Sequence, residues 1–219
     1  MSEMLIPRRT VLAAVGLGTA GALIGGSPAE AAVKLTVQEV QIRVAGWHTH
    51  LPITGVFDKP THDAVRGFQR AHGLPPDGVV DAATHDRLMA LAKPDGSTIS
   101  FEWAQFASPD GSGFAGGTAD EATVRERTRR LMYKLEALRH KLDGRVVHVT
   151  NGFHSTAHRA RLRGAGDSTH THGGTADITV AGLTTHAVHS VAQTCGFSGL
   201  GPWTQSWLHC DSGTELISP

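Results

Sequence analysis

Two short segments rich in histidine and aspartate place the tightest limit on how this chain can fold. The first is Ser168–Asp177 (STHTHGGTAD) and the second is Trp207–Asp211 (WLHCD). Side chains alternate between the two faces of a β-strand, so His170 and Asp177 would point to opposite faces of one continuous strand. The two glycines between them allow a turn or bulge that brings both to one side. His209 is expected to join them from another strand.

Two imidazoles and one carboxylate make a ligand set that is typical of a catalytic zinc site. Three protein ligands leave the fourth position open for a water that loses its proton near neutral pH and attacks a carbonyl. The chain has 14 histidines, so a single histidine indicates little. Taken together, His170, Asp177 and His209 predict a Zn²⁺ site and a hydrolase.

The first 31 residues are predicted to be a secretory signal rather than part of the fold. Arg8-Arg9 precedes an apolar stretch, Val11–Ile24, and Ala29–Ala31 offers small residues for a signal peptidase. The paired arginines favour the bacterial Tat route over Sec. The apolar stretch is shorter than the roughly 20 residues that span a bilayer. We therefore expect an exported protein, secreted or associated with the cell wall, without stable membrane insertion once the signal is removed.

The charge balance of the chain bears on its binding partners, and its cysteines bear on disulfide formation. The chain has 20 basic and 20 acidic residues, so its charge gives no indication of nucleic-acid binding, which would need a basic face. A monomer is expected. Cys195 and Cys210 are the two cysteines. In an exported protein they are predicted to form a disulfide, with two buried free thiols as the alternative.

A near-repeat organises the N-terminal block. Gly55–Val65 matches Gly78–Leu88, and each copy reads as a glycine turn, an aspartate, and a threonine that can cap the helix after it. Apolar residues at helical spacing, including Val37–Val44, predict a three-helix unit. The turn-rich cluster Lys93–Ser97 predicts a linker. The expected domains are therefore residues 32–93, a linker at 94–100, and residues 101–219.

This block resembles the peptidoglycan-binding module of the PGBD-1 type. The segments that carry the resemblance are Gly55–Asp58, Phe68–Arg70, His72–Leu74 and Asp77–Val80. The resemblance implies peptidoglycan as the partner, with wall glycan or peptide in a shallow groove.

The C-terminal block predicts an α+β fold, with an antiparallel sheet packed with helices. Val124, Leu131, Leu138 and their neighbours form one apolar stripe of a long helix, and its arginine-rich opposite side is expected to be solvated. Strands are predicted at 145–150, 176–180 and 207–211, and a helix at 185–194. Hairpin-like returns in place of regular βαβ units favour this class.

The same block resembles the zinc D-alanyl-D-alanine carboxypeptidases of the M15 metallopeptidase family. The resemblance rests on the pattern Ser-x-His-x-x-Gly-x-x-Ala-Asp followed by Trp-x-His-x-Asp, and on the preceding segment Asn151–Ser155. By position, the resemblance implies that His170, Asp177 and His209 are the zinc ligands. Asp211 is expected to accept a hydrogen bond from a ligand histidine.

Two positions depart from the family pattern. His154 stands where the family usually has an arginine that holds a substrate carboxylate or carbonyl. As an imidazolium it could do part of this task, and the alternative is that Arg159, Arg161 or Arg163 substitutes from another position. Ser206 stands where several members have an acidic general base, and serine cannot take that proton. His172 is the best local replacement, and a solvent-exposed loop histidine is the alternative interpretation. The predicted catalytic residues are therefore His172 and His154.

These observations favour an exported zinc peptidase that cleaves peptidoglycan stem peptides, of the D-Ala-D-Ala carboxypeptidase type. An endopeptidase that cuts cross-links is the nearest alternative, because a free terminal carboxylate needs a cation. A wall-binding protein that keeps its metal site with little turnover is a hypothesis from another class.

Overall fold

The computed structural model describes residues 34–162, 168–202 and 204–213. The predicted signal peptide lies outside these residues. From Leu35 onward the chain forms one compact unit. Among the helices described, none combines the length and apolar character needed to cross a bilayer.

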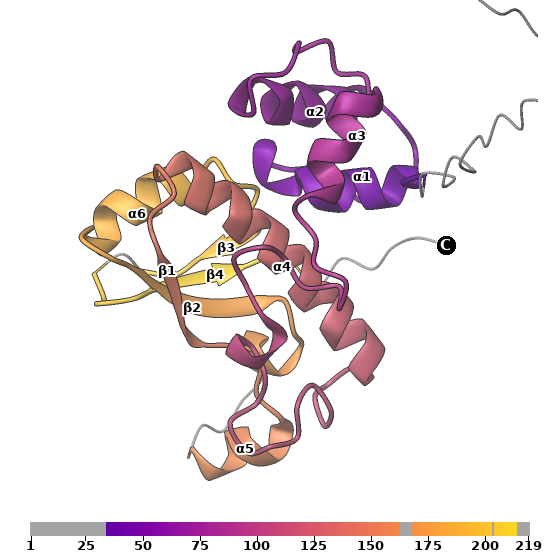
Figure 1. Ribbon diagram of the computed structural model, residues 1–219. Helices are drawn as coiled ribbons and strands as arrows, with labels where there is room; N and C mark the ends of the chain where they lie inside the picture. The colour runs from indigo at the N-terminus through magenta and orange to yellow at the C-terminus, as the bar shows by residue number, and fades with distance from the viewer. Residues whose placement is uncertain (1–33, 163–167, 203, 214–219) are drawn as a thin grey trace, which may run out of the picture. The chain divides into compact units, whose positions relative to one another are not determined.

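The N-terminal module consists of three helices, as predicted (Figure 1). They are α1 (Val37–Val44), α2 (Lys59–Ala71) and α3 (Ala82–Met89). Val65, Phe68 and Leu88 are fully buried between them.

The near-repeat has a structural basis that differs from the predicted one. Each helix is capped by the aspartate: Asp58 accepts from the Thr61 amide, and Asp81 accepts from the Thr84 amide. The prediction that threonine caps the helices was wrong. Both threonines are buried, and each hydroxyl accepts from the side-chain amide of a buried glutamine, Gln41 for Thr61 and Gln69 for Thr84. Each glutamine also accepts from a glycine backbone amide, Gln41 from Gly55 and Gln69 from Gly78. These hydrogen bonds hold each glycine turn against the helix that precedes it.

The segment predicted as a linker is a packed turn. Ala92 and Thr98 form an antiparallel bridge that closes it, and Ser97 and Thr98 are fully buried. The Trp103 indole donates to the Asp95 carbonyl at 3.1 Å. These contacts fix the chain between the two blocks.

The C-terminal block has the predicted α+β class. Its elements are α4 (Glu121–Lys141), β1 (Val147–Asn151), α5 (Thr156–Arg161), β2 (Thr175–Val180), α6 (Thr185–Ala192), β3 (Gly199–Leu200) and β4 (Leu208–Asp211). The strands form one antiparallel sheet in the order β1-β2-β4-β3. Helices α4 and α6 cover the sheet (Figure 1). Its core includes Leu131, Leu135 and Ile178.

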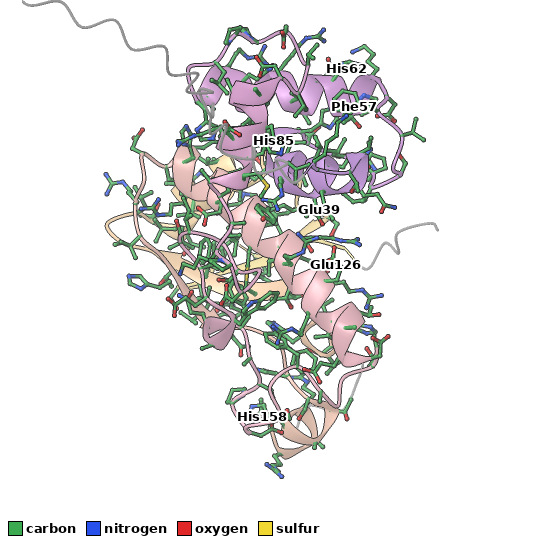
Figure 2. All side chains as sticks on the ribbon, turned by 45° about the vertical axis from the view of Figure 1, so that its right-hand side comes forward. Glu39, Phe57, His62, His85, Glu126 and His158 are labelled. Atoms are coloured by element: carbon green, nitrogen blue, oxygen red, sulfur yellow. The ribbon has the colours of Figure 1, made fainter. Side chains whose placement is uncertain are left out.

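Helix α4 also belongs to the core of the module. Its Tyr133 is 1% exposed and packs with the apolar side chains of α1, α2 and α3. Arg129 makes ion pairs with Glu39 of α1 and with Glu126, which Figure 2 labels beside each other where α1 meets α4. The expectation of a solvated arginine face was wrong, because the module covers this side of the helix.

The predicted disulfide is absent. Cys195 and Cys210 are both free thiols and both are buried. The Cys195 thiol donates to the Val191 carbonyl. The alternative interpretation, two buried free thiols, describes the structure.

Candidate metal centre

A row of polar side chains crosses three neighbouring strands. Asn151 of β1 pairs with Asp177 of β2, and Asp177 pairs with His209 of β4. Residues directly opposite each other in antiparallel strands project to the same face. A shift in register between Val149 and Asn151 puts Asn151 in the row. Bulges of this kind re-aim side chains near functional sites.

His170 reaches the row from outside the sheet. It lies on a 3₁₀ turn, Thr169–Thr171, and the chain then bends through Gly173 and Gly174 into β2. Both glycines have φ of +77°, which side chains other than glycine rarely adopt. A Cβ at Gly173 would also lie 2.8 Å from the Val124 carbonyl oxygen. The glycine pair makes the predicted turn and brings His170 to the side of Asp177.

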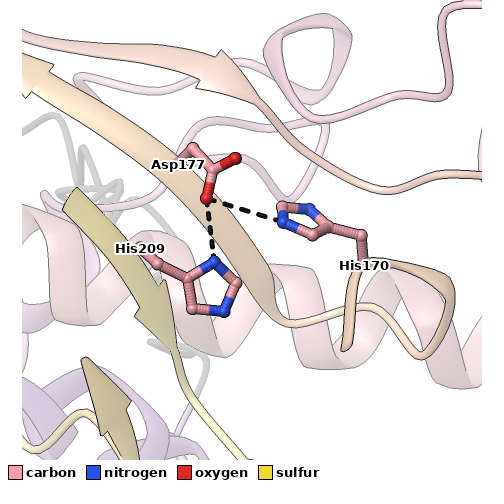
Figure 3. Close-up of side chains that lie close together, drawn as sticks. All are labelled: His170, Asp177 and His209. Carbon is pink, nitrogen blue, oxygen red and sulfur yellow. Dashed lines mark hydrogen bonds and ion pairs between the residues drawn. The ribbon is translucent and has the colours of Figure 1, made fainter. Parts of the chain in front are cut away.

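The three predicted ligands converge on one point (Figure 3). Asp177 Oδ1 lies 2.8 Å from His209 Nδ1 and 3.5 Å from His170 Nε2. One donor atom from each residue lies within 4.8 Å of the others. Burial by itself would raise the pKa of Asp177, but hydrogen bonds from His170 and His209 outweigh it and hold the pKa well below its usual range. A charged carboxylate between two imidazoles is therefore the stable state.

The surroundings of these side chains fit a metal ion. His170 Nδ1 donates to the Gly152 carbonyl at 2.6 Å, so Nε2, the nitrogen that faces Asp177, is the one that would bind an ion. His209 Nε2 lies 3.3 Å from Thr169 Oγ1. Outer partners of this kind fix the tautomer and the ring orientation of metal ligands. With two nitrogens and one oxygen, the donor set fits Zn²⁺ held by three protein ligands.

Asn151 is a supporting residue that the sequence analysis did not single out. Its Nδ2 donates to Asp177 Oδ2 at 3.2 Å. This bond occupies the carboxylate oxygen that faces away from the histidines and so turns Oδ1 toward them. The signal was present in the sequence, since Asn151 begins the segment Asn151–Ser155 that resembles the M15 pattern.

The support expected from Asp211 is not found. Its Oδ1 accepts from the Gly213 amide at 2.8 Å. Among the described residues, the hydrogen bonds to the ligand side chains come from Asn151, Gly152 and Thr169. Ser168 supports the site less directly, because its carbonyl accepts from Thr171 and closes the 3₁₀ turn.

Comparison with known proteins agrees with this site. Residues 110–211 match the family Peptidase M15, and residues 35–88 match the family described as a putative peptidoglycan binding domain. A zinc D-Ala-D-Ala carboxypeptidase from Streptomyces albus G is 32% identical over 213 residues, which cover 92% of this chain and 81% of the relative. The chain belongs to the M15 peptidase family. Both resemblances noted in the sequence are confirmed.

In this M15 peptidase, His154 lies against the metal centre. Its ring stacks on His170 with centroids 5.2 Å apart, and its Nε2 lies 2.5 Å from Asn151 Oδ1. Because Asn151 Nδ2 faces a carboxylate, its Oδ1 faces His154 and accepts from Nε2. The other nitrogen, Nδ1, is buried without a partner among the described residues.

The charge expected on His154 is not supported. Burial, followed by the nearby His170, His158 and Arg159, lowers the pKa of His154 to about 4. This shift favours the neutral imidazole over the imidazolium, and the catalytic role of His154 stays a prediction.

His172 follows the 3₁₀ turn and faces the start of α4. Its Nδ1 lies 2.8 Å from Thr118 Oγ1, and its carbonyl accepts from Arg127 at 2.9 Å. Its role as the general base stays a prediction. Ser206 is exposed and lines a separate small cavity with Thr185 and Leu208.

Proposed function

We propose that this protein is an exported zinc peptidase that cleaves the stem peptides of peptidoglycan, of the D-Ala-D-Ala carboxypeptidase type. The convergence of His170, Asp177 and His209 carries the proposal. A domain matched to peptidoglycan binding on the same chain supports the substrate, and the relative from Streptomyces albus G supports the reaction. A wall substrate in turn supports a site of action outside the cell membrane.

The chain's own residues have separable roles in this proposal. His170, Asp177 and His209 would hold a Zn²⁺ ion, which when bound would polarise a carbonyl and supply hydroxide near neutral pH. Asn151 orients the carboxylate of Asp177. His209 has the most exposed side chain of the three ligands, at 22%, so substrate approaches from its side. We assign proton transfer to the imidazole of His172, whose place beside Thr118 follows directly on the turn that carries His170.

The His172 role has a direct test. We expect His172→Gln to lower kcat by roughly 10²- to 10⁴-fold, the usual worth of a positioned general base, while zinc content stays the same. Metal analysis of the variant accompanies the rate measurement. A variant with wild-type kcat would exclude His172 as the base.

A second candidate function is cleavage of peptide cross-links, and the surroundings of His154 favour it. A terminal carboxylate is best held by a guanidinium that binds both oxygens. His154 has one nitrogen committed to Asn151 and only Nδ1 left over. It can contact one substrate atom at most, which suits an internal amide better than a free carboxylate.

Products from isolated sacculi separate these functions. The protein purified without residues 1–31 is incubated with sacculi, and the released material is identified by mass. Release of D-alanine supports the carboxypeptidase, and release of cross-link fragments supports the endopeptidase. If neither appears with zinc-loaded protein, the proposal is wrong.

The metal assignment is tested by Asp177→Ala, which we expect to lose zinc and activity together. Asp211→Asn is the matched control, because Asp211 lies on the same face of β4 as His209 and outside the metal cluster. Zinc bound by the two proteins is measured after dialysis. Equal zinc content in both variants would overturn the assignment.

We also propose the boundaries 1–31 for a Tat signal, 32–93 for the peptidoglycan-binding domain, 94–100 for the connection and 101–219 for the peptidase. Sequencing of the exported protein should find an N-terminus at residue 32. A culture medium and wall fraction that contain none of the protein would contradict export.

A further inference from the structure

A cleft of about 370 Å³ lies between the N-terminal module and the C-terminal half of α4. The module contributes Trp47, His72 and Arg87, and α4 contributes Arg139 and His140. None of these residues belongs to the metal centre. Clefts between domains are common places for ligands, and this one has no assigned role.

The floor of the cleft is aromatic. The ring of Trp47 meets those of His72 and His140 at centroid distances of 5.6 Å and 5.2 Å, and the two imidazoles lie 4.6 Å apart. Ile99 adds an apolar side chain that is 50% exposed at the same cleft. Trp and His rings present an apolar body with a polar tip, which suits a ligand that is itself part apolar and part polar, such as a sugar ring.

The walls of the cleft carry two available guanidinium groups. Within the described part of the chain, neither Arg87 nor Arg139 forms an ion pair with a carboxylate, whereas Arg129 and Arg130 of the same helix both do. Arg87 donates to His72 Nδ1 through Nε at 3.2 Å, so its position over the floor is fixed by a hydrogen bond. Guanidinium groups of this kind bind carboxylates through paired hydrogen bonds.

The acidic side chains of the cleft do not cancel this charge. Glu136 is 7% exposed and accepts from the amide and the hydroxyl of Ser100, at 2.7 Å and 2.9 Å. Asp143 is the other acidic residue that lines the cleft. Two arginines beside one available aspartate favour an anionic ligand.

We propose that this cleft binds peptidoglycan through a sugar unit that carries a carboxylate, with the ring on Trp47 and the carboxylate between Arg87 and Arg139. The inference rests on the proposed wall binding and adds its location and chemistry. Because each side of the cleft comes from a different block, the site exists only while the module packs against α4. The carboxylate can come from the lactyl group of a muramic acid or from the attached peptide.

Binding measurements on the full mature chain test the inference. The double variant Arg87→Gln/Arg139→Gln is compared with Arg70→Gln/Arg145→Gln, which removes the same charge from exposed arginines outside the cleft. The probes are intact sacculi, glycan strands stripped of peptide, and soluble stem peptide. We expect the first variant to bind sacculi about tenfold more weakly than wild type and the second to bind normally. Cleavage of a small soluble peptide should be unchanged in the second variant.

The outcomes are distinct. Preferential loss of binding to stripped strands identifies the lactyl carboxylate, and loss of binding to stem peptide identifies the peptide carboxylate. If both double variants bind sacculi as well as wild type, or weaken equally, the cleft is not the binding site, although wall binding itself stands. If the wild-type protein fails to bind sacculi, the proposed wall binding fails first, and the cleft proposal fails with it.

Discussion

Asn151 offers the sharpest test of how the metal centre is organised. It is not a proposed ligand, but it donates to Asp177 Oδ2 and accepts from His154 in the same amide plane. Removing it by Asn151→Ala leaves all three ligands in the chain. It frees the carboxylate of Asp177 to rotate, and it leaves both nitrogens of the buried His154 without protein partners.

The expected loss of zinc affinity can be estimated from the hydrogen bond that the charged carboxylate of Asp177 accepts from Asn151. A hydrogen bond to a charged group contributes about 1.5–3 kcal/mol, which corresponds to a change of roughly 10- to 100-fold in an equilibrium constant. The effect of changing outer partners of metal ligands falls in the same range. We therefore expect Asn151→Ala to bind zinc about 10- to 100-fold more weakly while the protein stays folded, because Asn151 lies near the edge of the core and is only half-buried.

The assay is a zinc titration in competition with a chelating indicator, and Thr150→Val is the control. Thr150 precedes Asn151 and also donates to Asp177, but to its backbone carbonyl at 3.1 Å. The control therefore removes a hydrogen bond to the same residue and leaves the carboxylate held. Equal zinc affinity in the two variants would refute the argument that Asn151 orients the ligand.

Three further predictions concern stability and thiol chemistry. Arg129→Met should lower the free energy of unfolding by about 2 kcal/mol, because it leaves the half-buried Glu39 without its main ion-pair partner. Chemical denaturation measures this change. An unchanged midpoint would show that the Arg129–Glu39 pair contributes nothing to stability. The pKa of His72 is lowered to about 4 by burial and by the nearby Arg87 and His140, so its contribution to stability is complete above pH 6.5 and is lost as the pH falls toward 4. His72→Gln should flatten that part of the pH–stability profile, and a variant with the wild-type profile would exclude His72 as the cause. Cys195 and Cys210 should resist alkylation in the native protein and react in denaturant, because burial raises the pKa of both thiols; an intact mass that shows a disulfide would contradict this.

Local patterns in the sequence predicted much of the architecture. The apolar spacing in Val37–Val44 and along α4 locates helices correctly, because that spacing reflects which side chains face a core. The cluster of candidate metal ligands was predictable for another reason. The residue types and the glycine pair at 173–174 are dictated by metal chemistry and turn geometry, both of which are local.

The parts that could not be predicted depend on contacts between distant segments. Asn151 supports Asp177 only because a register shift in β1 brings it opposite, and a bulge is not visible in a five-residue strand. Arg129 and Tyr133 lie on the side of α4 that the apolar stripe marks as outward. When two sides of a helix are buried, its apolar residues no longer form one clear stripe. The sequence pattern therefore does not show that a second group of helices packs against it.

The sharing of α4 between two cores has a mechanical consequence for an enzyme that works on a polymer. In a tethered arrangement, a flexible linker lets the catalytic site search a wide volume around the point of attachment, at an effective concentration set by linker length. Here the side chains that anchor the module and those that support the peptidase sheet lie on one continuous helix, so we expect the two parts to move together. On a fixed wall, such an enzyme would cleave bonds at a set distance from the point where its module binds. It would have to dissociate from that point before it could reach the next bond.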